Sequence, residues 1–236
     1  RADVAGLRGE VSNYWRFDGK ITVADFDSDG DPDAFISSKR GNELLANERG
    51  AFQRVAPKSL GLPERALNAT WVDYDNDGLQ DLHVVPDGIY RQVRKGDFEA
   101  TGLLAVAPHR YQAAIVHWYD QDNDGDRDVL VALNDNPTLW RWWQKPFKST
   151  DDEFAWVIKN WRNDTAGNHW LQVAVEGASG NPQAIGARVT VFTEGGAQAQ
   201  EVGSNDSAFF SQGHYRLYFG LGESPRAERI TVRWLD

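Results

Sequence analysis

Three short segments of the 236-residue chain carry aspartate at regular intervals, at positions 1, 3, 5 and 9 of each segment. They run from Asp25 to Asp33, from Asp73 to Asp81 and from Asp120 to Asp128. Glycine, which permits a tight backbone turn, occupies position 6 of each loop, as Gly30, Gly78 and Gly125. Aspartates at positions 1, 3 and 5 point three short carboxylates to one side of such a loop. Calcium takes six to eight oxygen ligands of this kind.

The rest of the ligand cage follows from the same spacing. The aspartate at position 9 completes the predicted cage, and the backbone carbonyl at position 7 is the expected fifth protein ligand. Calcium is favoured over magnesium, because magnesium uses fewer carboxylates and keeps more of its water. We therefore expect three calcium ions, one in each loop.

The spacing of the loops allows two other interpretations. An EF-hand needs a bidentate glutamate at position 12 between two helices, whereas position 12 here is Ile36, Val84 and Val131, each inside an apolar run. The loops could also be solvated acidic turns, because aspartate and glycine are common in turns. Carboxylates packed within a few ångströms repel one another, and three copies of one spacing favour a cation.

Composition narrows the function classes. The formal net charge is −10, and the three loops hold five, four and five of the 35 acidic residues. This acidity argues against a nucleic-acid partner. The absence of cysteine excludes disulfides, zinc–cysteine sites and thiol catalysis, and no apolar run reaches the ~18 residues of a membrane helix. The chain begins with Arg1 and shows no leader, so we expect a processed chain or a fragment of an extracytoplasmic protein.

The loops belong to a repeat of about 48 residues. Their first aspartates are 48 and 47 positions apart, and a phenylalanine follows each loop at a similar distance, as Phe52, Phe98 and Phe147. Short β-branched and aromatic runs flank each loop and predict strands. The predicted strands before the loops are 21–24, 69–72 and 113–118, and those after them are 34–36, 82–85 and 129–133. About four strands per repeat indicate β-propeller blades, so we predict an all-β fold with a partial propeller.

These residues resemble the FG-GAP/VCBS repeats of integrin-type propellers over roughly residues 18–150. The resemblance implies that calcium is ligated by the side chains of Asp25, Asp27, Asp29, Asp33, Asp73, Asp75, Asp77, Asp81, Asp120, Asp122, Asp124 and Asp128. It also implies main-chain ligation at position 7, by Asp31, Leu79 and Asp126, which explains why leucine is tolerated there.

The C-terminal part has a different pattern. Alternating strands are predicted at 168–175, 185–191, 215–219 and 229–234, separated by glycine-rich turns. Five stretches of this region, taken in order, resemble the ASPIC/UnbV domain of the cartilage acidic protein-like family. They are 168–171, 184–189, Glu201-Val202, Ser211-Gln212 and 219–222. We therefore divide the chain into repeats at 1–160 and a small β-sandwich-like domain at 161–236. Tyr218 departs from the histidine that relatives often carry.

The polar residues to watch in this domain are Arg188, Glu201, Ser211 and Gln212. They are candidates either for a site or for internal hydrogen bonds at strand ends and turns. The resemblance itself implies a fold more than a biochemical role.

Three functions were compared. The five histidines, His83, His109, His117, His169 and His214, show no metal-ligand spacing, and no catalytic motif is present. We therefore predict no catalytic residues and no enzyme, with a fragment of a calcium-dependent polysaccharide lyase as the enzymatic alternative.

A binding module is supported by Trp140 and Trp142, which alternate on one predicted strand and could stack on sugar rings or fill a partner's pocket. Core packing between blades is the competing interpretation of this pair. A structural subunit of a larger complex is the third possibility. The favoured function is a calcium-stabilised, non-catalytic module that binds a protein or a glycan outside the cytoplasm.

Overall fold

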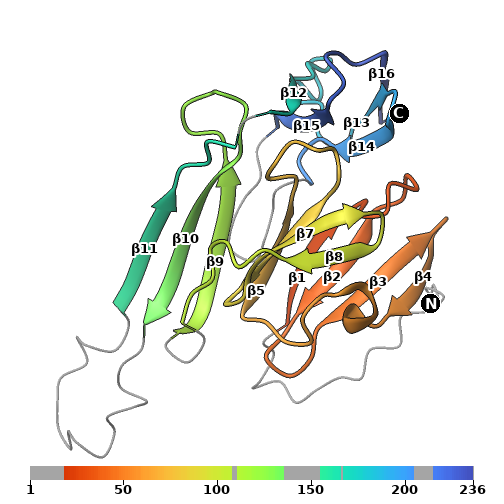
Figure 1. Cartoon of the computed structure of the whole chain (residues 1–236). Coiled ribbons are helices and arrows are strands. Elements are labelled where there is room, and N and C mark those ends of the chain that lie inside the picture. Colours follow the sequence, from red (N-terminus) through yellow and green to blue (C-terminus); the bar gives the residue numbers. More distant parts are fainter. Residues whose placement is uncertain (1–18, 108–110, 136–154, 166, 205–214, 236) are drawn as a thin grey trace, which may run out of the picture.

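The computed structural model describes residues 19–107, 111–135, 155–165, 167–204 and 215–235. These residues form an all-β fold of strands β1 to β16 with one 3₁₀ turn, η1 (Pro57–Leu60), and contain no α-helix (Figure 1). No helix in this part of the chain is long and apolar enough to cross a membrane. The predicted all-β class is confirmed.

The first repeat forms a four-stranded antiparallel sheet in chain order. Its strands are β1 (Lys20–Ala24), β2 (Asp33–Ser37), β3 (Glu43–Glu48) and β4 (Ala51–Val55). Alternation along β2 buries Phe35 completely, and Leu44 on β3 is buried on the same side. One face of this sheet is therefore apolar enough to require a neighbouring layer.

The second repeat forms a sheet of the same order. Its strands are β5 (Asn68–Val72), β6 (Asp81–Val85), β7 (Gly88–Arg94) and β8 (Asp97–Ala100). Every residue of β5 and β6 is buried, because both faces of this sheet are covered. The sheet is thus the central layer of the repeat region.

The third repeat contributes three described strands in the order β11-β10-β9. They are β9 (Tyr111–Tyr119), β10 (Asp128–Asp135) and β11 (Ala155–Trp161), and all pairs are antiparallel. The predicted four strands per repeat are thus present in the first two repeats, and the third has three among the described residues. Phe147 and the pair Trp140 and Trp142 lie outside the described residues.

Two hydrophobic cores join the three sheets. Trp71 is central to the core between the first and second sheets, where it stacks on Phe26 at 5.7 Å and meets Phe35 edge-on at 6.1 Å. Trp118 occupies the core between the second and third sheets and meets the buried His83 edge-on at 5.6 Å. Because β5 contacts both β1 and β9, the first strands of the repeats lie side by side. This arrangement of sheets is that of successive propeller blades.

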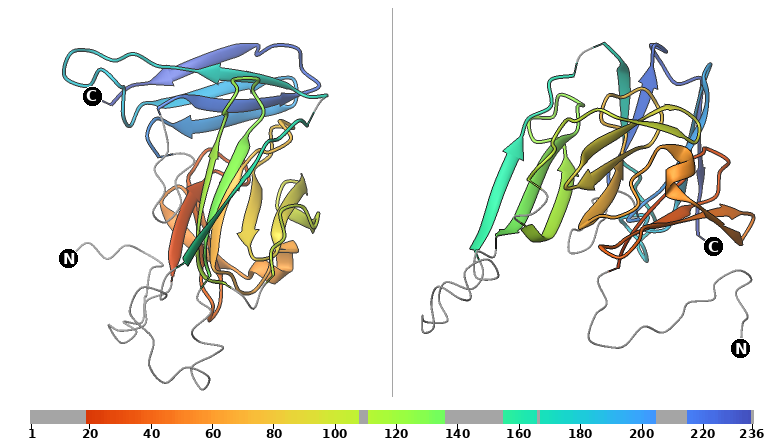
Figure 2. Two further views of the ribbon diagram at one scale, coloured as in Figure 1. Left: turned by 90° about the vertical axis from the view of Figure 1, so that its left-hand side faces the viewer. Right: turned by 60° about the horizontal axis from the view of Figure 1, so that its bottom comes forward.

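The C-terminal part forms two small sheets around its own core. One pairs β12 (His169–Val173) with β15 (Leu217–Gly222), and the other has the order β14-β13-β16. The latter strands are β14 (Gly196–Glu201), β13 (Arg188–Thr193) and β16 (Arg229–Arg233). Val189, Val191, Leu217 and Phe219 are buried between the two layers, which lie across one end of the repeat sheets (Figure 2).

Candidate metal sites in the three aspartate loops

Each aspartate loop connects the first strand of its sheet to the second. The loops therefore join β1 to β2, β5 to β6 and β9 to β10. All three place two residues in the left-handed backbone region, at positions 4 and 6. Position 4 is Ser28, Asn76 and Asn123, with φ of 55°, 57° and 61°, and position 6 is Gly30, Gly78 and Gly125, with φ of 100°, 90° and 93°. Glycine at position 6 is thus required by the turn itself.

The carboxylates at positions 1 and 5 hold this turn in shape. The position 1 aspartate accepts the N–H of the position 6 glycine, at 3.0 Å in the first two loops and 3.1 Å in the third. The position 5 aspartate accepts the N–H of position 7, at 2.8, 2.9 and 3.0 Å. The three loops therefore share one hydrogen-bonding plan and not merely one sequence pattern.

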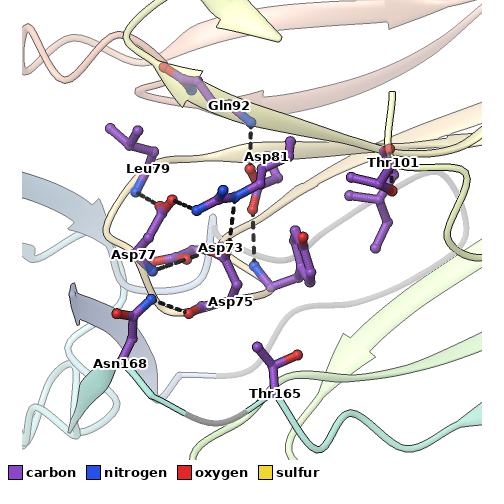
Figure 3. A network of polar contacts seen from close by, with 12 residues as sticks. Asp73, Asp75, Asp77, Leu79, Asp81, Gln92, Thr101, Thr165 and Asn168 are labelled. Carbon is purple, nitrogen blue, oxygen red and sulfur yellow. Dashed lines mark hydrogen bonds and ion pairs between the residues drawn. The ribbon is translucent and has the colours of Figure 1, made fainter. Parts of the chain in front are cut away.

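The position 9 aspartates fix each loop to the rest of its sheet. Asp81 accepts the N–H of Tyr74 at 3.3 Å through Oδ2 and that of Gln92 at 2.7 Å through Oδ1 (Figure 3). Asp33 and Asp128 make the equivalent pairs of bonds, the former with Phe26 and Asn47 and the latter with Gln121 and Asn163. All three side chains are fully buried. Position 9 therefore has a structural role that the spacing alone did not reveal.

The carboxylate oxygens converge in each loop. Three side chains per loop bring one oxygen each within 4.8 Å of the others, in the sets Asp25, Asp27, Asp29, then Asp73, Asp75, Asp81, then Asp120, Asp122, Asp128. Oδ1 of Asp25 is also buried without a hydrogen-bond partner. A buried anionic oxygen without a donor, beside two other carboxylates, suits a hard divalent cation. The residues present therefore fit calcium.

The electrostatics of the loops point the same way. Burial, followed by the repulsion of neighbouring aspartates, raises the pKa of Asp25 to about 6. Burial raises the pKa of Asp33 to about 7, and it raises the pKa values of Asp73 and Asp81 well above the usual range. These carboxylates are thus poorly solvated anions, and a bound cation would stabilise their charged form.

Described arginine side chains form ion pairs with two of the three loops, the second and the third. Arg91 on β7 pairs through Nε with Asp75 at 2.7 Å and through a terminal nitrogen with Asp77 at 2.8 Å. Arg162, which follows β11, pairs with Asp122 at 3.0 Å and Asp124 at 3.7 Å. Each guanidinium group therefore forms ion pairs with the aspartates at positions 3 and 5 of one loop. Neither arginine was predicted from the sequence pattern.

The C-terminal module, of which the structure describes residues 167–204 and 215–235, contacts the second loop directly. The backbone N–H of Gly222 donates to the carbonyl of Asn76 at 2.9 Å, and Nδ2 of Asn168 donates to the carbonyl of Asp75 at 2.8 Å (Figure 3). A Cβ atom on Gly220 would lie 2.1 Å from Oδ2 of Asp73. The glycines that carried the ASPIC/UnbV resemblance thus permit close contact with this loop.

The module also contacts the third loop. Gln172 on β12 donates from Nε2 to Oδ2 of Asp120 at 2.7 Å. The buried Arg127 places its guanidinium 4.2 Å from the ring centre of Tyr218, a cation–π contact. Tyr218, which departs from the family's histidine, therefore takes part in the contact between the two regions.

The remaining candidate residues are the polar residues of the C-terminal part and the histidines. Arg188 and Glu201 are cross-strand partners of β13 and β14, whereas Ser211 and Gln212 lie outside the described residues. His83 is buried, which lowers its pKa to about 3. His117 stacks on Tyr119, and His169 is exposed at the start of β12. The three described histidines are not brought together with any of the acidic sets.

The blade-like sheets with their acidic loops define a β-propeller-type repeat protein. The family model described as FG-GAP-like repeat matches residues 25–84, and the model described as ASPIC and UnbV matches residues 177–236. The chain thus combines an FG-GAP-like repeat with a C-terminal ASPIC and UnbV segment, as the sequence motifs predicted. A search of curated proteins gave no match.

Proposed function

We propose that this chain is a calcium-stabilised, non-catalytic module that acts outside the cytoplasm and binds a protein or a glycan. The observation that carries the proposal is the common plan of the three loops. Each holds three converging carboxylate oxygens on a turn fixed by its own backbone N–H groups. The expected ligands are the aspartates at positions 1, 3, 5 and 9 with the main-chain carbonyl at position 7.

Calcium would act on stability in this proposal. The loops join the first and second strands of each sheet, so a bound ion would neutralise the buried aspartates where those strands meet. The module contacts the loops through Asn168 and Gln172, so the same ions would also support the contact between the two regions. A rigid scaffold of this kind suits a binding or structural role.

The described histidines support a role without catalysis. A general base must be able to take up a proton near neutral pH, and burial lowers the pKa of His83 to about 3. His117 is stacked on Tyr119 at 5.7 Å. His83 therefore does not suit the role of the base in the lyase alternative.

The experiment that tests the proposal is calcium titration of the chelator-treated protein by calorimetry, with magnesium as the competing ion. We expect three calcium ions per chain and much weaker binding of magnesium, because the loops supply more carboxylates than magnesium uses. Absence of calcium binding at millimolar concentration would reduce the loops to acidic turns and overturn the proposal.

A further inference from the structure

The position 9 aspartates define which residues are equivalent in the three repeats. Asp33, Asp81 and Asp128 each accept a backbone N–H from a residue beyond the second strand, namely Asn47, Gln92 and Asn163. The residues that precede these donors are therefore structural equivalents. They are Ala46 in the first repeat, Arg91 in the second and Arg162 in the third.

The two arginines make the same contact and alanine cannot. Arg91 pairs with Asp75 and Asp77, and Arg162 pairs with Asp122, Asp124 and also Asp164, so each arginine offsets part of the negative charge at positions 3 and 5 of its own loop. Among the described residues, no lysine or arginine forms an ion pair with Asp25, Asp27 or Asp29 in the first loop. Among these described residues, the first loop therefore has no arginine in the place that Arg91 and Arg162 occupy in the other two loops.

The carboxylate sets differ in the same way. In the first loop the converging oxygens come from positions 1, 3 and 5, whereas in the other two they come from positions 1, 3 and 9. The missing position 5 side chains, Asp77 and Asp124, are those that the arginines contact. In the two loops whose set leaves out position 5, that carboxylate is therefore one that an arginine contacts.

We propose that Arg91 and Arg162 lower the calcium affinity of the second and third loops, so that the first loop binds calcium first. This inference rests on the proposed function. A guanidinium group and a divalent cation compete for the same carboxylate oxygens, and they repel each other when both are close. From the repulsion between a single and a double charge a few ångströms apart in a water-like dielectric, each arginine weakens its site by about ten-fold.

The two arginines also make the repulsion between aspartates differ from loop to loop when no metal is bound. In the second and third loops the guanidinium offsets part of the repulsion between aspartates, whereas the described cations that act on the first loop form no ion pair with it. These include Lys95 near Asp27 and Arg188 near Asp25. The first loop therefore depends most on a metal ion, and the second and third loops keep their shape with less help from one.

Calcium titration followed by nuclear magnetic resonance resolves the three sites. The N–H groups of Gly30, Gly78 and Gly125 are site-specific reporters, because each donates to the position 1 carboxylate of its own loop. Calcium chloride is added to the ¹⁵N-labelled full chain after removal of metal with a chelator. We expect the signal of Gly30 to reach saturation at about ten-fold lower free calcium than those of Gly78 and Gly125.

Two reciprocal substitutions test the role of the arginine. Arg91→Ala should tighten the second loop about ten-fold, with the Gly30 and Gly125 titrations unchanged. Ala46→Arg places an arginine at the equivalent position of the first loop and should weaken that site by a similar factor. Arg94→Ala is the matched control, because Arg94 lies on the same strand but pairs with Asp97, away from the loops.

The outcomes separate this inference from the proposed function. If the wild-type chain binds no calcium, the proposed function fails. If it binds calcium but Arg91→Ala titrates like Arg94→Ala, or binds more weakly than the wild type, the arginine does not compete with the ion and the inference is overturned. Arg162→Ala repeats the test on the third loop, where the arginine side chain is half-exposed and its loss spares the core.

Discussion

Asn168 donates a hydrogen bond of 2.8 Å from Nδ2 to the backbone carbonyl of Asp75, although 93 positions separate the two residues. One partner precedes β12 of the C-terminal module and the other occupies position 3 of the second aspartate loop. The bond therefore links the module to a proposed metal site. It suggests that the loops and the module respond to calcium together.

Removal of calcium should lower the stability of the whole chain. Calcium modules outside the cell typically bind with dissociation constants of ~10⁻⁴–10⁻³ M. Millimolar calcium, at roughly ten times such a constant in the first loop and about equal to it in the other two, contributes about 1.4 kcal/mol at the first loop and about 0.4 kcal/mol at each of the others, or about 2 kcal/mol in all. At about 2–4 °C per kcal/mol for chains of this size, a chelator should lower the melting temperature by roughly 6 °C in scanning calorimetry. An unchanged melting curve would contradict structural calcium.

Substitutions at positions 3 and 9 should differ in their dependence on calcium. Asp27→Ala removes a proposed ligand of the first loop and should reduce the free energy of unfolding by about 1–2 kcal/mol in millimolar calcium, with little change in chelator. Asp75→Ala and Asp122→Ala also remove an ion pair with an arginine, so these variants should lose some stability in chelator as well. Denaturant unfolding, with and without calcium, gives both values.

Asp81→Ala should instead destabilise under both conditions. The substitution leaves the N–H groups of Tyr74 and Gln92 without an acceptor in a buried place, at about 1–3 kcal/mol for each group. The same unfolding experiment measures the loss. A loss that disappears in chelator would show that Asp81 acts only as a metal ligand.

The contact between Asn168 and the second loop can be tested by hydrogen exchange. Asn168→Ala removes a bond worth about 1 kcal/mol, so exchange in residues 73–81 should become about five-fold faster. Asn181→Ala is the control, because the side chain of Asn181 bonds to Ile185 within the module itself. Equal exchange in the two variants would mean that the bond does not hold the loop.

Much of the fold was predictable from the sequence. The alternation of apolar residues around Phe35 and the repeated aspartate spacing indicated the strands and loops of the first two sheets. Strand β14 was missed, because its sequence of glycine, alanine and glutamine has low strand propensity and it pairs with β13 through a glycine hairpin. Such a strand is defined by its partner and not by its own residues.

The site was only partly predictable. The spacing identified the aspartates, but the double hydrogen bonding of Asp81 depends on Gln92, which lies on a later strand, β7. Arg91 and Arg162 were missed because they are separated from their loops by whole strands, and the intervals differ between repeats. Side-chain contacts across a sheet have no fixed spacing in the sequence, so a single chain without relatives does not reveal them.

The surroundings of the three position 6 glycines have a consequence for the evolution of the repeats. A Cβ atom on Gly30 would meet only Arg188, at an ordinary 3.5 Å, whereas one on Gly125 would lie 1.8 Å from the indole ring of Trp170. The third copy is thus constrained twice, by its own turn and by the neighbouring module. New repeat proteins usually arise when repeats are duplicated or exchanged between positions. A repeat moved in this way would keep the constraint set by its own turn and would lose the one set by the neighbouring module. The three copies have therefore stopped being interchangeable parts.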